Sequence, residues 1–422
     1  MTIPSPLRSV FPAILLAGIS ATAAATETEW PQFRGPTGEG ISCAKDVPIE
    51  WTDTKNVAWK QEIPGKGWSS PVLSKGRLYL TSAVTAPENS EVTLHVLCME
   101  ASTGALVWDK EVIHPDPASV AAIHSKNSPA SPTPIIDGDR LYVHFGHMGT
   151  AELSLDGAIL WTQKDIKYPP VHGNGGSPVL FDHHLLIFGC DGAKDPALIA
   201  LDAATGQVSW KTPRNTGAKK TFSFCTPLII DADGKKELIS PFSGFVGGYD
   251  PRDGHELWRV AYGEGYSVVP RPVFAQGLLF LSSGFDQPVL YAIDPKGANG
   301  DVTATNIAWT QRKGAPCTPS TLVLDDALYY VSDGGIATCA DPKTGKAYWS
   351  ERLGGSFSSS PIAAEGRIYF QNESGVGYVI QAGKTYQLLS KNDLGERSLA
   401  SYAVTDGALF IRTESHLWKI AK

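Results

Sequence analysis

The stretch Ala200-Leu-Asp-Ala-Ala-Thr-Gly-Gln-Val-Ser-Trp210 decides the fold, because its pattern returns along most of the chain. An acidic residue stands four positions before a glycine, and a tryptophan stands four positions after it. The same frame occurs at Glu100-Gly104-Trp108, Asp250-Gly254-Trp258 and Asp341-Gly345-Trp349. Glycine accepts the positive φ of a tight turn, and the acidic side chain can accept hydrogen bonds from the turn amides. The pattern therefore predicts a repeated strand–turn–strand unit.

Variants of this frame extend it to further units. A shortened form is Asp156-Gly157-Trp161, and an insertion at 296–306 separates Asp294 from Trp309. In the seventh unit Gln387 takes the tryptophan position. An indole can fill the gap between wedge-shaped neighbours while its N–H finds a carbonyl. We therefore expect a structural docking role for the repeated tryptophans, which are Trp59, Trp108, Trp161, Trp210, Trp258, Trp309 and Trp349.

Each unit opens with a short motif that precedes an apolar strand. The openings are Ser70-Pro71, Thr133-Pro134, Ser177-Pro178, Thr226-Pro227, Arg271-Pro272, Thr318-Pro319, Ser360-Pro361 and the divergent Ser401-Tyr402. Their mean spacing is about 47 residues, and a period of this length with short strands is typical of a propeller blade. Arg271 is the exception among otherwise small opening residues.

The count of strands closes the ring. The eighth unit ends on Leu417-Trp-Lys-Ile420 as its third strand, and a fourth is available at Asn56–Ile63, which carries its own tryptophan. A terminal strand that completes the last blade removes open sheet edges. The sequence thus predicts an all-β, eight-bladed propeller of four-stranded antiparallel blades over residues 57–422, with an N-terminal arm at 26–56.

The first residues read as a secretory signal peptide over 1–25. Arg8 supplies the positive charge, Phe11–Ile19 the apolar core and Ala23–Ala25 a small-residue cleavage site. A disordered apolar leader is the alternative. No cysteine follows the apolar core directly, so we expect no lipid anchor. These features predict a periplasmic or secreted protein, cleaved near Ala25.

Composition narrows the class of protein further. The 36 basic and 43 acidic residues give a net charge of −7, which argues against a nucleic-acid partner. No run of 18 apolar residues follows the N-terminal segment, so we expect no membrane span, and the closed ring favours a monomer. None of the six cysteines has CxxC spacing, and several lie in apolar strand patterns, so we expect buried free thiols rather than disulfides.

These motifs together resemble the pyrroloquinoline-quinone-like (quinoprotein-like) β-propeller repeat family, in its exported bacterial branch. The match includes residues 200–210, Trp30-Pro-Gln-Phe-Arg-Gly-Pro36, the segment 124–134 and His172-Gly-Asn-Gly-Gly-Ser-Pro178. The resemblance implies two branches. Quinone-dependent dehydrogenases hold pyrroloquinoline quinone (PQQ) and Ca²⁺ in the central funnel, usually beside a vicinal disulfide, whereas assembly propellers are non-catalytic scaffolds. This chain has no Cys-Cys pair and no CxxCH.

Loops that enter the inner strands surround one mouth of a propeller channel. There we expect a ligand-binding set of His124, Lys126, Asn127, His172, Asn174, Arg271, Asp286 and Arg397. The first five precede adjacent inner strands, so the fold brings them together. Arg271 suggests an anion or a quinone carboxylate, or else a pair with Asp286 or Glu373. Capping of loop amides and channel water is the plainer alternative.

Three functions follow as hypotheses. The complete repeat lattice favours a binding or scaffold module for a small molecule or an exported protein. The family resemblance makes a PQQ-dependent oxidoreductase of the alcohol or sugar type the first alternative, and a carbohydrate-binding propeller the second. No residue is assigned a catalytic or metal-binding role, because neither a nucleophile elbow nor a calcium loop is present in the sequence.

Overall fold

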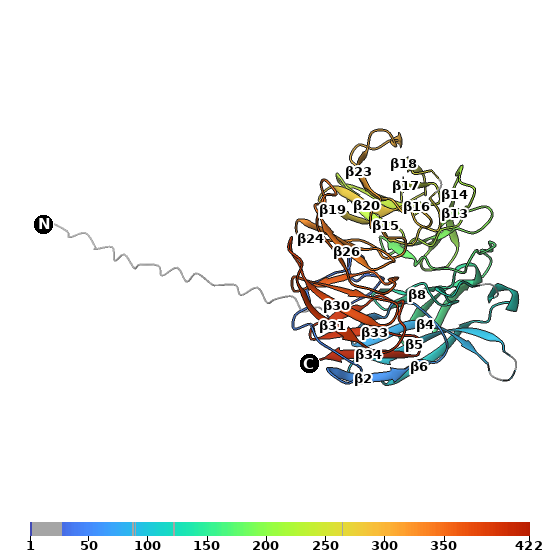
Figure 1. The fold of residues 1–422 in the computed structure, drawn as a ribbon. Coiled ribbons are helices and arrows are strands. Elements are labelled where there is room, and N and C mark those ends of the chain that lie inside the picture. Colours follow the sequence, from blue (N-terminus) through green and yellow to red (C-terminus); the bar gives the residue numbers. More distant parts are fainter. Residues whose placement is uncertain (2–27, 87, 89, 121–122, 264) are drawn as a thin grey trace.

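The computed structural model describes all residues except 2–27, 87, 89, 121–122 and 264. The predicted signal peptide therefore lies almost entirely outside the described residues. Eight antiparallel sheets follow one another around a ring in chain order, which confirms the predicted propeller (Figure 1). Short turns join successive strands, and inner strands of neighbouring blades contact one another around the channel, such as β3 (Val72–Ser74) and β7 (Ile135–Asp137).

Each blade has four strands that run from the channel to the outer edge. In blade order they are β3, β4 (Arg77–Thr85), β5 (Val92–Glu100), β6 (Leu106–Ile113); β7, β8 (Arg140–His144), β9 (Thr150–Ser154), β10 (Ile159–Gln163); β11 (Val179–Phe181), β12 (Leu185–Cys190), β13 (Ala197–Asp202), β14 (Val208–Pro213); β15 (Leu228–Ala232), β16 (Lys235–Phe242), β17 (Phe245–Tyr249), β18 (Glu256–Ala261); β19 (Val273–Ala275), β20 (Leu278–Ser282), β21 (Leu290–Ile293), β23 (Ile307–Gln311); β24 (Leu322–Leu324), β25 (Ala327–Val331), β26 (Ile336–Ala340), β27 (Ala347–Arg352); β28 (Ile362–Ala364), β29 (Arg367–Gln371), β30 (Val376–Gln381), β31 (Leu388–Asp393); and β32 (Ala403–Thr405), β33 (Ala408–Arg412), β34 (His416–Ala421), β2 (Val57–Glu62).

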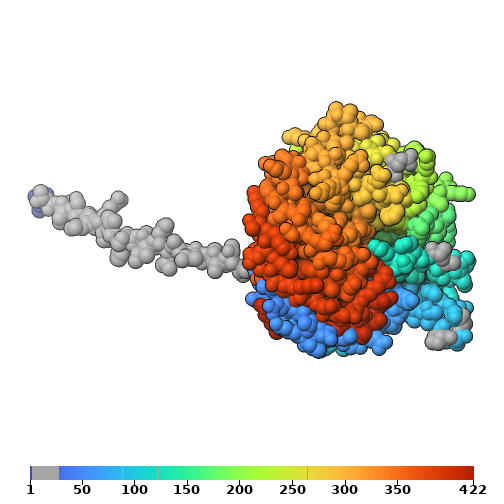
Figure 2. All heavy atoms as spheres, in the orientation of Figure 1, coloured from blue at the N-terminus to red at the C-terminus, as the bar shows by residue number. Residues whose placement is uncertain are grey.

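The N-terminal strand closes the ring as predicted. Strand β2 pairs antiparallel with β34, with Lys60 opposite Trp418 and Glu62 opposite His416. Figure 1 shows blue β2 beside red β34, and Figure 2 shows the two ends of the colour scale in contact on the surface. This pairing joins the two ends of the chain, so no blade is left incomplete.

Two short strands extend the basic pattern. The insertion at 296–306 places β22 (Gly300–Asp301) parallel to β18, so it lengthens the preceding blade. The arm places β1 (Ile41–Ser42) parallel to β28. The sequence pattern predicted neither pairing, because both depend on contacts between different units. The only other elements among the described residues are the 3₁₀ turns η1 (Pro117–Val120) and η2 (Gly146–Met148).

The seams between blades repeat one contact. Trp161 donates its indole N–H to the Ala203 carbonyl of the next blade at 2.9 Å, and a Cβ at Gly206 would lie 2.5 Å from the indole ring. Equivalent N–H bonds to the next blade, of 2.9 to 3.2 Å, are donated by Trp59, Trp108, Trp210, Trp309 and Trp349. The turn glycine is thus required by the indole beneath it as well as by its positive φ.

Trp258 departs from this pattern. Its indole is fully buried and donates to the Glu237 carboxylate within its own blade at 2.8 Å. The next blade carries the insertion in place of the short turn that receives the indole elsewhere. Burial raises the pKa of Glu237, and the indole bond opposes that rise.

Two expectations from composition meet the structure directly. No helix among the described residues is long and apolar enough to cross a membrane. The described part of the chain forms no disulfide, and Cys98, Cys190, Cys225 and Cys339 are buried as expected. Cys43, however, is exposed and Cys317 is half-buried, because they lie in the arm and in a mouth loop rather than in strands.

Candidate ligand-binding pocket

A pocket of about 500 Å³ lies at the channel mouth, where the loops lead into the inner strands. That volume lies within the range of small-molecule sites. Its aromatic lining consists of Phe33, Trp68, Phe222, Phe224, Tyr266 and Phe285. Serines and threonines of the strand openings supply most of the remaining wall.

The N-terminal arm crosses the channel beneath this pocket. Trp30 pairs with Leu73 of β3 through bonds of 2.8 and 2.9 Å, and the Gly40 carbonyl accepts the Ala363 N–H of β28 at 2.8 Å. The arm thereby passes from the first blade to the seventh. Phe33, which lies between these anchors, lines the pocket, and the anchors lie farther along the inner strands than the opening residues do. The arm therefore floors the pocket and turns the channel mouth into a cup.

Two buried arginines hold the arm. Arg271 donates through Nη1 to the Phe33 carbonyl at 2.8 Å and through Nε to the Pro227 carbonyl at 3.1 Å. Arg34 donates to the Thr321 carbonyl at 2.6 Å. Burial lowers the pKa of Arg271 to about 10, and burial together with Arg271 lowers the pKa of Arg34 to about 9. The predicted pair of Arg271 with Asp286 or Glu373 is not formed, because its side chain is turned under the arm.

A ring of hydrogen bonds links the strand openings around the channel. The Ser70 N–H donates to Thr133 Oγ1 at 3.0 Å, and each opening in turn donates to the hydroxyl of the next blade. The chain of acceptors continues through Ser177, Thr226, Ser320, Ser360, Ser401 and back to Ser70. Arg271 has no hydroxyl, so the bond from Thr226 is missing there.

This ring corrects one assignment from the sequence. The Arg271 N–H donates to Ser320 Oγ at 2.9 Å, so the sixth unit opens at Ser320 rather than at Thr318-Pro319. Thr318 instead donates its hydroxyl to Asp333 at 2.6 Å, in the loop that leads to this opening. The proline was misleading because it stands two residues before the true opening.

One wall of the pocket is aromatic and carries a cation. Phe222 packs edge to face against His172 and Tyr266, with ring centroids 5.4 and 5.5 Å apart. Lys220 Nζ donates to Tyr266 Oη at 2.7 Å and lies 3.9 Å from the centroid of that ring. His124 meets His172 edge to face at 5.5 Å. Burial, then His124 and Lys220, lower the pKa of His172, so its imidazole is neutral at pH 7.

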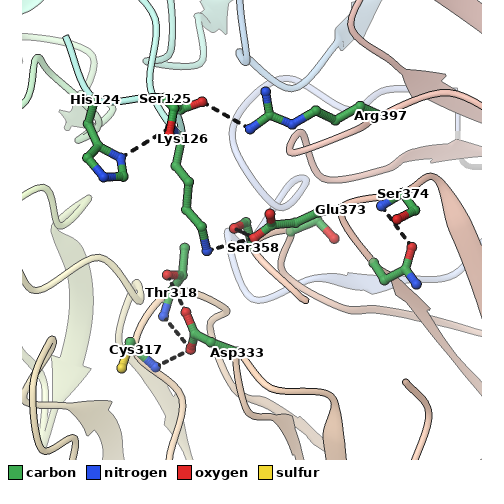
Figure 3. A network of polar contacts seen from close by, with 12 residues as sticks. His124, Ser125, Lys126, Cys317, Thr318, Asp333, Ser358, Glu373, Ser374 and Arg397 are labelled. Carbon is green, nitrogen blue, oxygen red and sulfur yellow. Dashed lines mark hydrogen bonds and ion pairs between the residues drawn. The ribbon is translucent and has the colours of Figure 1, made fainter. Parts of the chain in front are cut away.

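The opposite wall is a polar network that spans several blades (Figure 3). Lys126, from the loop before β7, reaches Glu373 Oε1 of the seventh blade at 2.7 Å, and Ser358 donates to the same carboxylate at 2.7 Å. Arg397 donates to the Ser125 carbonyl at 3.0 Å, which fastens that loop from the other side. These contacts fix the loop over part of the mouth.

The structure divides the eight predicted ligand-binding residues into three groups. His124, Lys126, Asn127 and His172 line the pocket. Asp286 and Arg397 lie at its rim: Asp286 accepts a bond from Tyr266 Oη at 3.2 Å, and the Arg397 guanidinium lies 5.4 Å from the Trp68 ring centroid.

Asn174 and Arg271 form the third group, which points away from the pocket. Asn174 is buried and lies 2.9 Å from His147 Nδ1 through its own Nδ2, while its Oδ1 accepts the Tyr168 hydroxyl at 2.8 Å. Sequence reasoning missed Phe33, Phe222 and Phe224 as pocket residues. A signal was present for the last two, since both stand in the loop just before Thr226-Pro227.

Comparison with known proteins agrees with this fold. The family model described as "Outer membrane protein assembly factor BamB" matches residues 52–225 and 298–416. The solved structure of BamB from Moraxella catarrhalis superposes with a TM-score of 0.60 at 14% identity, covering 86% of this chain and 96% of that one. A europium-containing methanol dehydrogenase gives 0.60 at 11% identity, with 94% and 98% covered. A computationally designed protein, Ika8, gives 0.56 at 12% identity, with 89% and 100% covered.

The search of curated proteins returned no match. At the identities above, the structural likeness shows the fold alone.

Proposed function

Because the chain belongs to the PQQ-like β-propeller family of the assembly factor BamB, we propose that it is an exported, non-catalytic binding or scaffold module. It takes a small molecule, or a side chain of a protein partner, into the mouth pocket. The observation that supports this is the cup itself: about 500 Å³ with an aromatic wall and a floor made by Phe33. Such a site suits a ligand that is held rather than transformed.

The charged groups of the mouth support binding over catalysis. Asp333 accepts the Cys317 N–H at 2.6 Å, the Thr318 N–H at 3.2 Å and the Thr318 hydroxyl at 2.6 Å. Glu373 accepts from Lys126 and Ser358. A general base needs a carboxylate or imidazole within reach of a substrate proton. Both carboxylates are instead occupied by donors of the protein.

The residues of the mouth do not fit a quinone held by Ca²⁺. Calcium takes six to eight oxygen ligands, several of them carboxylates. Among the described residues no three His, Cys, Asp or Glu side chains converge on one point, and Asp333 is already filled by protein donors. We therefore derive no redox step. A carbohydrate is also less well supported, because the Arg397 guanidinium covers the ring of Trp68.

A fluorescent apolar probe tests the binding proposal. N-phenyl-1-naphthylamine should bind saturably at one site in the purified protein, and Phe222→Ala should weaken it about tenfold through lost aromatic contact. Tyr348→Ala is the matched control, since Tyr348 is an exposed aromatic on the outer strand β27. Equal affinity in the two variants would contradict the proposal.

Turnover is the second arm of that test. The protein should oxidise neither alcohols nor sugars when quinone and Ca²⁺ are added, and measurable turnover would overturn the non-catalytic assignment. Export is checked separately by N-terminal sequencing of protein from the periplasm or medium, which should begin near Thr26. An intact Met1 on the exported protein would contradict it.

A further inference from the structure

We propose that the floor of the mouth pocket binds an oxyanion, namely the carboxylate of a ligand whose apolar body packs against Phe222 and Tyr266. This rests on the proposed function, because it assigns the ligand class of the same pocket. Three observations carry it: the polarity of the hydroxyl ring, the balance of charge around the pocket, and the aromatic wall.

The hydroxyl ring presents donors to the pocket. Each ring oxygen already accepts a backbone N–H from the preceding opening, at 2.9 to 3.1 Å. A hydroxyl also carries one hydrogen that it can donate. In the described part of the chain only Ser360 has an acceptor for that hydrogen, which is Ser320 Oγ at 3.0 Å. The ring members with a hydrogen left to donate all line the pocket: Ser70, Thr133, Ser177, Thr226, Ser320 and Ser401.

An acceptor for these hydrogens must therefore come from the pocket contents. A ligand that offers only acceptor atoms matches the ring, and an ionised carboxylate is such a group. Hydrogen bonds to a charged acceptor are roughly twice as strong as neutral ones. The ring thus favours an oxyanion over a neutral polar group.

The charge around the pocket points the same way. Lys126 and Lys220 line it, against Asp333 as the lining carboxylate. Glu373 neutralises Lys126, whereas Lys220 forms no ion pair within the described chain; its ammonium group contacts Tyr266 instead. An ammonium beside an aromatic wall can pair with an anionic ligand while the ligand's apolar part remains on the rings.

The floor adds positive charge from below. Arg271 replaces a hydroxyl at the eighth ring position and binds the carbonyl of Phe33. Arg34 is fully buried beside it, and its Nε and Nη1 have no hydrogen-bond partner. Glu39 is the carboxylate that interacts with both guanidinium groups. Two buried cations with one counter-charge leave a positive potential under the pocket, where low dielectric strengthens it.

Two probes that share one skeleton test the inference. 1-Anilinonaphthalene-8-sulfonate and N-phenyl-1-naphthylamine differ by the sulfonate, so their affinity ratio measures the preference for an anion. The wild-type protein should bind the sulfonate about tenfold more tightly, at one site. Lys220→Gln should lower that ratio about fivefold without changing the neutral probe. Lys343→Gln, in an exposed turn of the sixth blade, is the matched control.

A ring variant tests the hydroxyls themselves. Thr226→Val removes one donor while keeping side-chain shape, and it should lower the sulfonate affinity and leave the neutral probe in place. Since the variant also removes the acceptor of the Ser177 N–H, the affinity ratio in the wild type remains the primary measurement. Equal wild-type affinities for the two probes, or a ratio unchanged by Lys220→Gln, would overturn the inference.

Competition identifies the source of the carboxylate. N-acetylphenylalanine should displace the sulfonate probe, and N-acetylphenylalanine amide should not, because the two differ only in the charged group. A longer peptide ending in free phenylalanine that competes better than phenylacetate would indicate a peptide C-terminus, and the reverse order a free small acid. If neither fluorescent probe binds, the proposed function fails with the inference; if both bind equally, only the oxyanion assignment fails.

Discussion

The seams between blades and the mouth of the channel are built in opposite ways. At six seams a tryptophan donates to a carbonyl of the next blade, with little variation in distance. Around the mouth each blade contributes something different: a cation at Lys220, an aromatic ring at Phe222, a carboxylate at Asp333. The difference teaches that the repeat specifies the ring, whereas the positions that escape the repeat specify the ligand.

The largest expected effect is at the irregular seam. Trp258→Ala should lower the free energy of unfolding by about 3–5 kcal/mol, because it empties a fully buried site and leaves Glu237 without its donor. Chemical denaturation measures it. Trp59→Ala, at a half-buried indole, should lower stability less. Equal losses at the two positions would show that the irregular seam is no tighter than a regular one.

A pair of glycines separates the seam contact from backbone strain. Gly206→Ala adds a Cβ 2.5 Å from the Trp161 ring at a φ of +70°, whereas Gly234→Ala meets nothing within 4 Å at a φ of +81°. We expect losses of about 3 and about 1 kcal/mol in the free energy of unfolding. The difference measures the indole contact alone. Equal losses would mean that the turn, not the seam, requires glycine.

Histidines near the mouth should make its blades sensitive to acid. Burial lowers the pKa of His144 to about 3, and it also lowers the pKa of His147. A base with a lowered folded pKa contributes stability that is present above pH 6.5 and is lost as pH falls below it. For His144 the loss between pH 7 and pH 5 is about 2 kcal/mol.

The measurement is the difference in unfolding free energy between wild type and His144→Gln at the two pH values. This difference is needed because Asp191, whose pKa is raised by burial, acts in the opposite direction: its contribution is lost as pH rises. The difference should shrink by about 2 kcal/mol on going from pH 7 to pH 5. A constant difference would contradict the assignment of a neutral, buried His144.

The smallest effect on stability should come from the rim of the mouth. Phe285 is 56% exposed and lines the pocket, so Phe285→Ala should change the free energy of unfolding by less than about 0.5 kcal/mol. It should nevertheless weaken binding of N-phenyl-1-naphthylamine, measured by fluorescence titration. A stability loss without a change in affinity would place Phe285 among the structural residues.

The sequence predicted what the repeat carries. The frame around Gly206 and Trp210 was sufficient for the blade count and for closure by the strand at Val57–Glu62, since both follow from periodicity. Arg271 was recognised as exceptional, yet its partners are carbonyls of the arm. Only the folded ring brings Phe33 under the mouth, because the arm is far from every mouth loop in the sequence. No local pattern could show that floor.

The most direct test of the account is ¹⁹F NMR of protein labelled with 5-fluorotryptophan, which gives one resonance for each of the 11 tryptophans. On saturation with N-phenyl-1-naphthylamine, the resonance that is missing in Trp68→Phe should shift, while those of the seam residues Trp108 and Trp210 stay in place. Shifts at the seams with an unchanged Trp68 resonance would contradict the claim that the mouth pocket is the binding site.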